Sequence, residues 1–411
     1  MRRTFTILFF LLFLTGCAAS PAPPENAASP IISTVTAPPS AREPAEIVAL
    51  WLSFYDLTLP KGGISEKKYV GIYAALFDEA TEYGVNTLFV HVRPFTDAIY
   101  PSEIYPWSEI LTGTQGVDPG YDPLGILCEL AEERDLQLHA WLNPFRITPD
   151  HRDLSKLDRK NPALAHIEAQ DGWVRQVGSR YYWNPAMPET HALIYEGVRE
   201  LLERYPLAGI HIDDYFYPTT DRGFDQAQYA AYRAQGGALS LEDWRREMVS
   251  QFVAGLYRTV HRVKPGAILS ISPTANIAKN YDDYYADAAR WMREPGFADW
   301  MVPQVYFGFE HAKLPFAATA RAWVVLPRHG GLRLVFGLAA YKTGQEDELA
   351  GAGRGEWQAK DDILARQTVY ARNLEGYGGI ALFSCTGLFG KELTDIAQNE
   401  KEYLHKLLIF K

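Results

Sequence analysis

Residues 207–218, LAGIHIDDYFYP, join a short apolar run to two adjacent carboxylates. Side chains along a strand point alternately to its two faces. One face would hold Ala208, Ile210 and Ile212, and the other would hold Gly209, His211 and Asp213. An apolar face suits a layer of helices and a polar face suits the inside of a closed sheet, so this stretch is typical of a barrel strand that ends in an active site.

The same combination of a short apolar run, a loop and an amphipathic stretch recurs along the chain from residue 46. The eight predicted strands are Ile47–Phe54, Val85–Arg93, Leu136–Asn143, Leu207–Asp213, Ala267–Ser272, Trp300–Tyr306, Arg333–Ala340 and Gly379–Ser384. The predicted helices are Glu66–Tyr83, Leu124–Arg134, Thr190–Tyr205, Leu241–Val263, Tyr284–Arg293, Phe316–Leu326, Lys360–Leu374 and Glu392–Leu408. Eight such units predict an α/β fold, a single (β/α)8 TIM barrel over residues 46–411, although a doubly wound open sheet shows the same alternation.

Polar residues gather at the ends of the predicted strands. The last inward layer would contain Ser53, Arg93, Asn143, Asp213, Ser272 and Tyr306, and the layer beneath it Trp51, His91, His139, Trp141, His211, Ser270 and Gln304. A barrel that needed only stability would place Val, Ile and Leu at these positions. We therefore expect the functional site at the carboxyl ends of the strands, although a buried polar network without chemistry would show the same pattern.

Two long connections, 94–123 and 144–189, follow the second and third predicted strands. Loops of this length in a compact domain are usually functional. Both are rich in aromatic residues, among them Trp107 and Trp183. Aromatic faces suit sugar rings, and they suit protein contacts equally well. We predict that Trp107 and Trp183 bind substrate.

The adjacent carboxylates Asp213 and Asp214 end the fourth predicted strand, and because neighbouring side chains on a strand face opposite ways they need not form a catalytic pair with each other. Cleavage of a glycosidic bond requires two carboxyl groups. We expect Asp213 to point inward beside Arg93 and His211 and to stay ionised, as a nucleophile or as a stabiliser of positive charge on a sugar carbon. The second carboxyl stays open from the residues alone. Asp214 and Asp97 rank first, and Glu310 ranks third.

Two other classes of function compete with a glycosidase. His91, His139 and His211 lie at matching depth on three strands, and three His with a carboxylate can hold zinc, as in a metal-dependent hydrolase or deacetylase acting on amino sugars. Against zinc, the chain has no His-Glu-x-x-His motif, and we predict no cofactor. A non-catalytic glycan-binding module would share the same groove. No Gly-x-Ser-x-Gly motif supports a serine nucleophile.

The N-terminus predicts export and a membrane anchor. Arg2 and Arg3 precede an apolar run that ends in Leu14-Thr15-Gly16-Cys17, the pattern of a bacterial lipoprotein signal peptide over residues 1–16. Cys17 would carry the lipid. Residues 17–45 are rich in Pro, Ala and Ser and read as a flexible tether. We therefore expect an extracytoplasmic protein anchored to a bacterial membrane through Cys17.

Composition excludes some partners and leaves others open. The 411 residues are 47% hydrophobic and 22% charged, which is typical of a globular protein. The net charge is −10, and no basic run suggests a nucleic-acid partner. Three cysteines cannot form a disulfide framework. The expected partners are a glycan substrate and the membrane, and the oligomeric state is undetermined.

Several motifs together resemble the glycosyl-hydrolase-like 10 family from about Glu46 to Gly390. They include Val92-Arg93-Pro94, Asp97-Ala98-Ile99-Tyr100-Pro101-Ser102, Pro106-Trp107-Ser108, His139-Ala140-Trp141-Leu142-Asn143-Pro144-Phe145-Arg146, His211-Ile212-Asp213-Asp214-Tyr215 and Val302-Pro303-Gln304-Val305-Tyr306. The resemblance implies a TIM barrel that hydrolyses glycosidic bonds, with peptidoglycan strands freed of their peptides as the substrate. It also implies catalytic roles for Asp213 and Asp214, and cleft positions for Arg93, Asp97, His139, Asn143 and Tyr306. Ala186-Met187 follows Asn184-Pro185 where relatives often have Gly.

Overall fold

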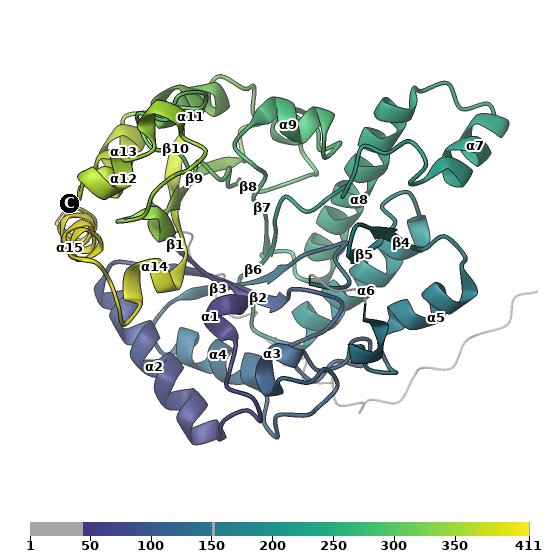
Figure 1. Ribbon diagram of the computed structural model, residues 1–411, viewed down its shortest axis with the longest axis horizontal. Helices are drawn as coiled ribbons and strands as arrows, with labels where there is room; N and C mark the ends of the chain where they lie inside the picture. Colours follow the sequence, from purple (N-terminus) through teal and green to yellow (C-terminus); the bar gives the residue numbers. More distant parts are fainter. Residues whose placement is uncertain (1–43, 150–152, 411) are drawn as a thin grey trace, which may run out of the picture. The chain divides into compact units, whose positions relative to one another are not determined.

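Eight parallel strands close into a barrel in the order β1-β10-β9-β8-β7-β6-β3-β2 (Figure 1). The computed structural model describes residues 44–149 and 153–410. The barrel strands are β1 (Ile47–Leu52), β2 (Thr87–Arg93), β3 (Gln137–Leu142), β6 (Gly209–Ile212), β7 (Ile268–Ile271), β8 (Trp300–Met301), β9 (Arg333–Ala339) and β10 (Tyr377–Phe383). All eight coincide with predicted strands. Because β1 pairs with both β2 and β10, the sheet is closed and the open-sheet alternative is wrong.

The principal helices surround the barrel (Figure 1). They are α2 (Glu66–Glu82), α4 (Pro123–Glu132), α6 (Pro188–Arg204), α8 (Leu241–Val263), α10 (Ala288–Arg293), α11 (Phe316–Val324), α13 (Ile363–Arg372) and α15 (Asp395–Ile409). Each overlaps a predicted helix, but α10 begins four residues later than predicted. Tyr285 has a left-handed φ of 53°, and the Asp287 side chain caps the helix by accepting from the Arg290 amide. Within the described residues, none of the helices combines the length and apolarity needed to cross a membrane.

Short elements decorate the connections. They are α1 (Phe54–Leu57), α3 (Glu109–Thr112), the 3-10 turn η1 (Leu154–Lys156), α5 (Pro162–Ala169), β4 (Val174–Val177), β5 (Arg180–Trp183), α7 (Gln226–Ala234), α9 (Ile277–Asp282), η2 (Ala340–Lys342), η3 (Gly351–Gly353), α12 (Glu356–Ala359) and α14 (Cys385–Phe389). The antiparallel β4–β5 hairpin lies in the long connection after β3, where the sequence pattern predicts no strand. Its Arg175–Tyr182 and Gln176–Tyr181 pairs give a local ladder too short to predict from periodicity.

The barrel strands alternate as predicted. Val48, Leu50 and Leu52 pack with the helices in the main core, whereas Trp51 packs inside the barrel in a separate cluster. The other members of that interior cluster are Ile47, Ala49, Phe89, Trp141, Trp300, Val302, Val335 and Ala381. The interior is so tightly packed at Gly209 that a side chain would not fit. A Cβ there would lie 2.7 Å from Nδ1 of His139 and 2.4 Å from the Ile268 carbonyl oxygen.

Candidate active site

The two adjacent carboxyl groups lie together at the carboxyl end of β6. The strand ends at Ile212, so the alternation of side chains along a strand does not determine the direction of Asp213 or Asp214. Asp213 is 3% exposed; its Oδ2 accepts from Trp141 Nε1 at 3.2 Å and its Oδ1 from the Tyr215 amide at 3.3 Å. Asp214 is partly exposed, and its Oδ1 accepts from Gln304 Nε2 at 3.3 Å. Side chains from β3 and from the segment after β8 therefore hold one carboxyl each.

Burial, and not a neighbouring cation, controls the charge of this pair. Burial raises the pKa of Asp213, and the charge of Asp214 raises it further. Burial raises the pKa of Asp214 as well, while the Gln304 hydrogen bond and the charges of Lys279 and Arg146 act in the opposite direction. Both effects favour the protonated form of Asp213, in contrast to the ionised carboxylate expected from the sequence. Two interacting carboxyls whose pKa values are both raised favour a state with one proton on the pair, which supplies an acid and a carboxylate at once.

Arg93 does not lie beside Asp213 as predicted. The β2–β3 register shifts between His91 and Arg93, so that Arg93 pairs with Leu142 of the helix-facing set. Its guanidinium donates to the Pro144 carbonyl oxygen at 3.3 Å and lies 5.2 Å from the ring centre of Tyr105. A bulge of one residue reverses which face a side chain occupies. The cation that lowers the pKa of Asp213 is instead Arg146.

His211 and His139 lie inside the barrel, in the layer beneath the acid pair. Trp51 Nε1 donates to His211 Nε2 at 3.0 Å, and Nδ1 of the same ring is 2.8 Å from Ser270 Oγ. Because Nε2 accepts, the ring is neutral and its Nδ1–H donates to Ser270. Burial lowers the pKa of His211 and lowers that of His139 to about 3. Both residues are fully buried, so the structure places them as supports of the interior, not at the surface where a substrate would bind.

The three barrel histidines do not form a metal site. His91 stacks on Trp141 with ring centres 3.6 Å apart, while both nitrogens of His211 are occupied by Trp51 and Ser270. Within residues 44–149 and 153–410, no group of three His, Cys, Asp or Glu side chains is arranged to hold a metal ion. The zinc alternative therefore lacks its predicted ligand set.

Tyr306 lies within electrostatic reach of the acid pair, and Asn143 follows β3. The Tyr306 ring is half-buried, stacks on Phe383 at 5.5 Å and meets the edge of Trp51 at 6.4 Å. Burial raises the pKa of its hydroxyl, and the charges of Asp214 and Asp213 contribute. Asn143 donates to the Pro94 carbonyl oxygen at 3.0 Å, and its buried Oδ1 has no hydrogen-bond partner among the described residues.

Asp97 supports a loop and is not brought to the acid pair. Its Oδ2 accepts from Ser108 Oγ at 2.8 Å and from Gln115 Nε2 at 3.4 Å, both on the connection after β2. It lines a small cavity with Glu109 and Lys156. Burial raises the pKa of Asp97 to about 6. As a second catalytic carboxyl, Asp97 lies in the wrong place.

Trp183 and Trp107 also differ from expectation in their exposure. Trp183 is fully buried and donates from Nε1 to Thr96 Oγ1 at 2.8 Å, so its ring is not available to a sugar. Trp107 is partly buried and packs against the main core. Glu310, the third-ranked carboxyl, is exposed. Cys17 lies outside the described residues.

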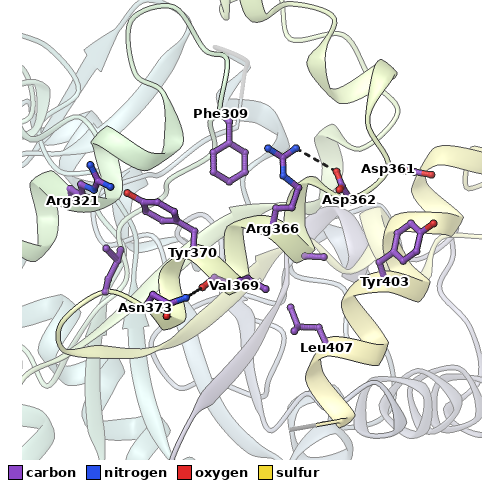
Figure 2. Close-up of a pocket in the computed structure, with 12 residues that line it drawn as sticks. Phe309, Arg321, Asp361, Asp362, Arg366, Val369, Tyr370, Asn373, Tyr403 and Leu407 are labelled. Carbon is purple, nitrogen blue, oxygen red and sulfur yellow. Dashed lines mark hydrogen bonds and ion pairs between the residues drawn. The ribbon is translucent and has the colours of Figure 1, made fainter.

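A groove of about 820 Å³ lies on the outer helix layer, and none of the predicted site residues lines it (Figure 2). Its walls come from α11, α13 and α15 together with Phe309, and include Arg366, Tyr370 and Tyr403. The Arg366–Asp362 ion pair on its wall joins two residues that lie four apart in the sequence. The groove contains none of the acid–base groups described above.

Sequence reasoning missed Arg146 as a site residue. It follows β3 in the Asn143-Pro144-Phe145-Arg146 segment, and its charge acts on both Asp213 and Asp214. Because it lies beyond the strand, period-two alternation gave no orientation for it. The available signal was its place in the polar segment 143–146 at the end of a barrel strand.

Residues 47–350 match the family described as Glycosyl hydrolase-like 10. The chain belongs to this family. Among curated relatives of this glycosyl-hydrolase-like 10 member, Glycosyl hydrolase YngK of Bacillus subtilis (strain 168) is 35% identical over 369 residues, covering 85% of this chain and 70% of the relative. Glycosyl hydrolase DigH of Escherichia coli (strain K12) is 30% identical over 381 residues, covering 85% of each.

Solved structures show the same fold at low sequence identity. The PgaB (BpsB) glycoside hydrolase domain from Bordetella bronchiseptica aligns with a TM-score of 0.57 at 15% identity, covering 89% of this chain and 99% of that domain. The catalytic domain of β-amylase from Paenibacillus polymyxa aligns with a TM-score of 0.53 at 11% identity, covering 87% and 97%. The family and the barrel together make this chain a glycosidase-type protein.

Proposed function

We propose that this glycosyl-hydrolase-like 10 member cleaves O-glycosidic bonds in a bacterial cell-wall glycan, with peptidoglycan strands as its substrate. The observation that carries the proposal is the adjacent pair Asp213 and Asp214 at the carboxyl end of β6, where TIM-barrel enzymes place their catalytic groups. The names of the curated relatives, both called glycosyl hydrolases, support the reaction class.

The pair supplies both halves of acid–base chemistry. The protonated carboxyl gives its proton to the oxygen that leaves the sugar as the C–O bond breaks, and the ionised carboxyl stabilises the positive charge on the sugar carbon. A water molecule then adds to that carbon and gives its proton to the carboxylate that the acid has become. Asp213 is the more deeply buried of the two, which favours its protonated form, and we assign it the acid. Asp214 accepts from Gln304 and lies in the field of Lys279 and Arg146, which favours its ionised form.

The location of the reaction belongs to the same proposal. We infer that Cys17 is acylated and that residues 17–45 tether the catalytic domain to a bacterial membrane, on its extracytoplasmic side. A lipid anchor would hold the enzyme close to the wall, where glycan strands are accessible.

The test measures new reducing ends and product masses after incubation of the purified protein with peptide-free peptidoglycan strands. Asp213→Asn and Asp214→Asn should each lower turnover on the order of 10²- to 10⁴-fold, because an amide can neither donate nor hold the required proton. Glu310→Gln, at an exposed carboxyl beyond β8, is the matched control and should retain turnover. Full activity in either folded Asn variant would refute the assignment.

A further inference from the structure

Arg146 is a buried cation that lies between two aromatic rings. Its guanidinium carbon is 4.4 Å from the ring centre of Tyr215 and 4.9 Å from that of Phe95, and the residue is 8% exposed. Its carbonyl oxygen accepts from Thr96 Oγ1 at 3.2 Å, and its backbone forms an antiparallel bridge with Tyr182. Two ring contacts and a backbone bridge restrict the position of the guanidinium.

The charge of Arg146 acts on Asp213 and Asp214, but among the described residues its guanidinium makes no direct contact with a carboxylate. No ion pair joins Arg146 to a carboxylate there, and its buried Nε has no hydrogen-bond partner. Arg245 shows how the same fold treats another buried guanidinium: it donates to both carboxylate oxygens of Asp225 and to the hydroxyl of Tyr285. Burying a guanidinium donor without a hydrogen-bond acceptor is costly, and a bound anion would remove that cost.

The position of Arg146 indicates where that ligand would lie. The residue stands within electrostatic reach of Asp213, Asp214 and His91, which all belong to the barrel mouth. Tyr215, one of its two covering rings, is 43% exposed, so this side of the mouth opens to solvent. An anion bound by Arg146 would therefore lie beside the bond on which the acid pair acts.

We propose that Arg146 binds a carboxylate borne by the glycan and thereby selects carboxylate-bearing sugar units next to the cleaved bond. A planar guanidinium matches a carboxylate with two parallel hydrogen bonds, whereas a neutral amide offers a single acceptor. The assignment rests on the proposed function and adds to it a specificity residue and the chemical group that this residue recognises.

The experiment compares two forms of one glycan: peptide-free peptidoglycan strands with free lactyl carboxylates, and the same strands with these carboxylates coupled to methylamine. Both kcat/KM and the binding constant are measured for each form, binding being measured by calorimetry. The wild type should prefer the carboxylate form by about 10- to 100-fold, as expected for a charge-assisted pair. In Arg146→Gln the ratio between the two forms should fall to about 1, chiefly through KM.

Two further variants sharpen the result. Arg146→Lys keeps the charge but loses the planar fork, so its preference should be intermediate. Arg175→Gln is the matched control, because Arg175 also lies over a ring, that of Phe224, and donates only to the Gly223 carbonyl oxygen. Its preference for the carboxylate form should equal that of the wild type.

The outcomes distinguish a failure of the proposed role of Arg146 from a failure of the proposed glycoside hydrolysis. Equal losses on both substrates in Arg146→Gln would show that Arg146 acts only through the charge of the acid pair, and would overturn the proposal. A wild type without preference in cleavage or binding would overturn it too. A wild type that binds the carboxylate form selectively but cleaves neither form would refute the proposed hydrolysis and leave the role of Arg146 supported.

Discussion

At the scale of single residues, burial decides roles that residue type leaves open. Asp97, Asp213 and Asp214 are chemically identical and all follow barrel strands. Asp213 and Asp214 meet at the barrel mouth, whereas Asp97 is enclosed by Ser108 and Gln115 of its own loop. Burial raises the pKa of all three. The same physical effect therefore serves catalysis at one site, as we propose, and costs stability at the other.

The cost at Asp97 predicts a pH dependence of folding. Its pKa is raised from 3.8 to about 6 in the folded state, so the folded protein binds this proton more tightly than the unfolded chain does. The stabilisation is complete below about pH 4 and is lost as the pH rises to about 6, a change of about 3 kcal/mol. Asp97→Asn should remove this part of the decline in the free energy of unfolding, measured by urea denaturation at a series of pH values. Parallel curves for wild type and variant would contradict it.

At the scale of elements, the connection after β6 is fastened to α8 by a buried ion pair. Arg245 of α8 and Asp225 are both completely buried, and Tyr217 donates to the same carboxylate at 3.0 Å. Arg245 also donates to the Asp221 carbonyl oxygen at 2.6 Å. This cluster closes the loop that begins with the acid pair, so it positions Asp213 and Asp214 from a distance.

Removing one partner of this pair should destabilise the protein strongly. Asp225→Ala leaves the Arg245 charge buried without compensation, and the expected loss in the free energy of unfolding is about 3–5 kcal/mol. Arg222→Ala breaks the surface ion pair between Arg222 and Glu242, whose side chains are 72% and 42% exposed. This change should lower the free energy of unfolding by less than about 1 kcal/mol. Urea denaturation of both variants checks the contrast. Similar losses in the two would show that the buried cluster has no special role.

At the scale of the whole molecule, barrel closure depends on a pairing across more than 300 residues of sequence. β1 pairs with β10 in the register Ile47–Gly379 to Leu50–Leu382. Glu46 strengthens the seam, because its carboxylate accepts from Arg372 at 2.8 Å and from the Tyr377 hydroxyl at 2.7 Å. Gly379 has a φ of 152°, and a Cβ there would lie 2.1 Å from the Ile47 carbonyl oxygen.

Gly379→Ala should therefore damage closure of the barrel. The new methyl group collides with backbone on the facing strand, which cannot move without breaking the ladder, and we expect a loss of more than about 3 kcal/mol in stability. Gly266→Ala is the control, because a Cβ there meets no atom within 4 Å. Thermal unfolding of the two variants gives the comparison. A Gly379→Ala protein that melts like the control would contradict the importance of this seam.

Local patterns in the sequence were sufficient for the eight strands and the main helices, because strand alternation and helix periodicity are short-range properties. Only the tertiary structure decided that a bulge turns Arg93 toward Tyr105, that Trp183 is buried, and that Arg146 faces the acid pair. Register shifts, loop closure and burial arise from contacts between segments distant in the chain, and burial in turn sets the charge of each carboxyl. For that reason the fold was predictable from the sequence, whereas the protonation and partners of the candidate site were not.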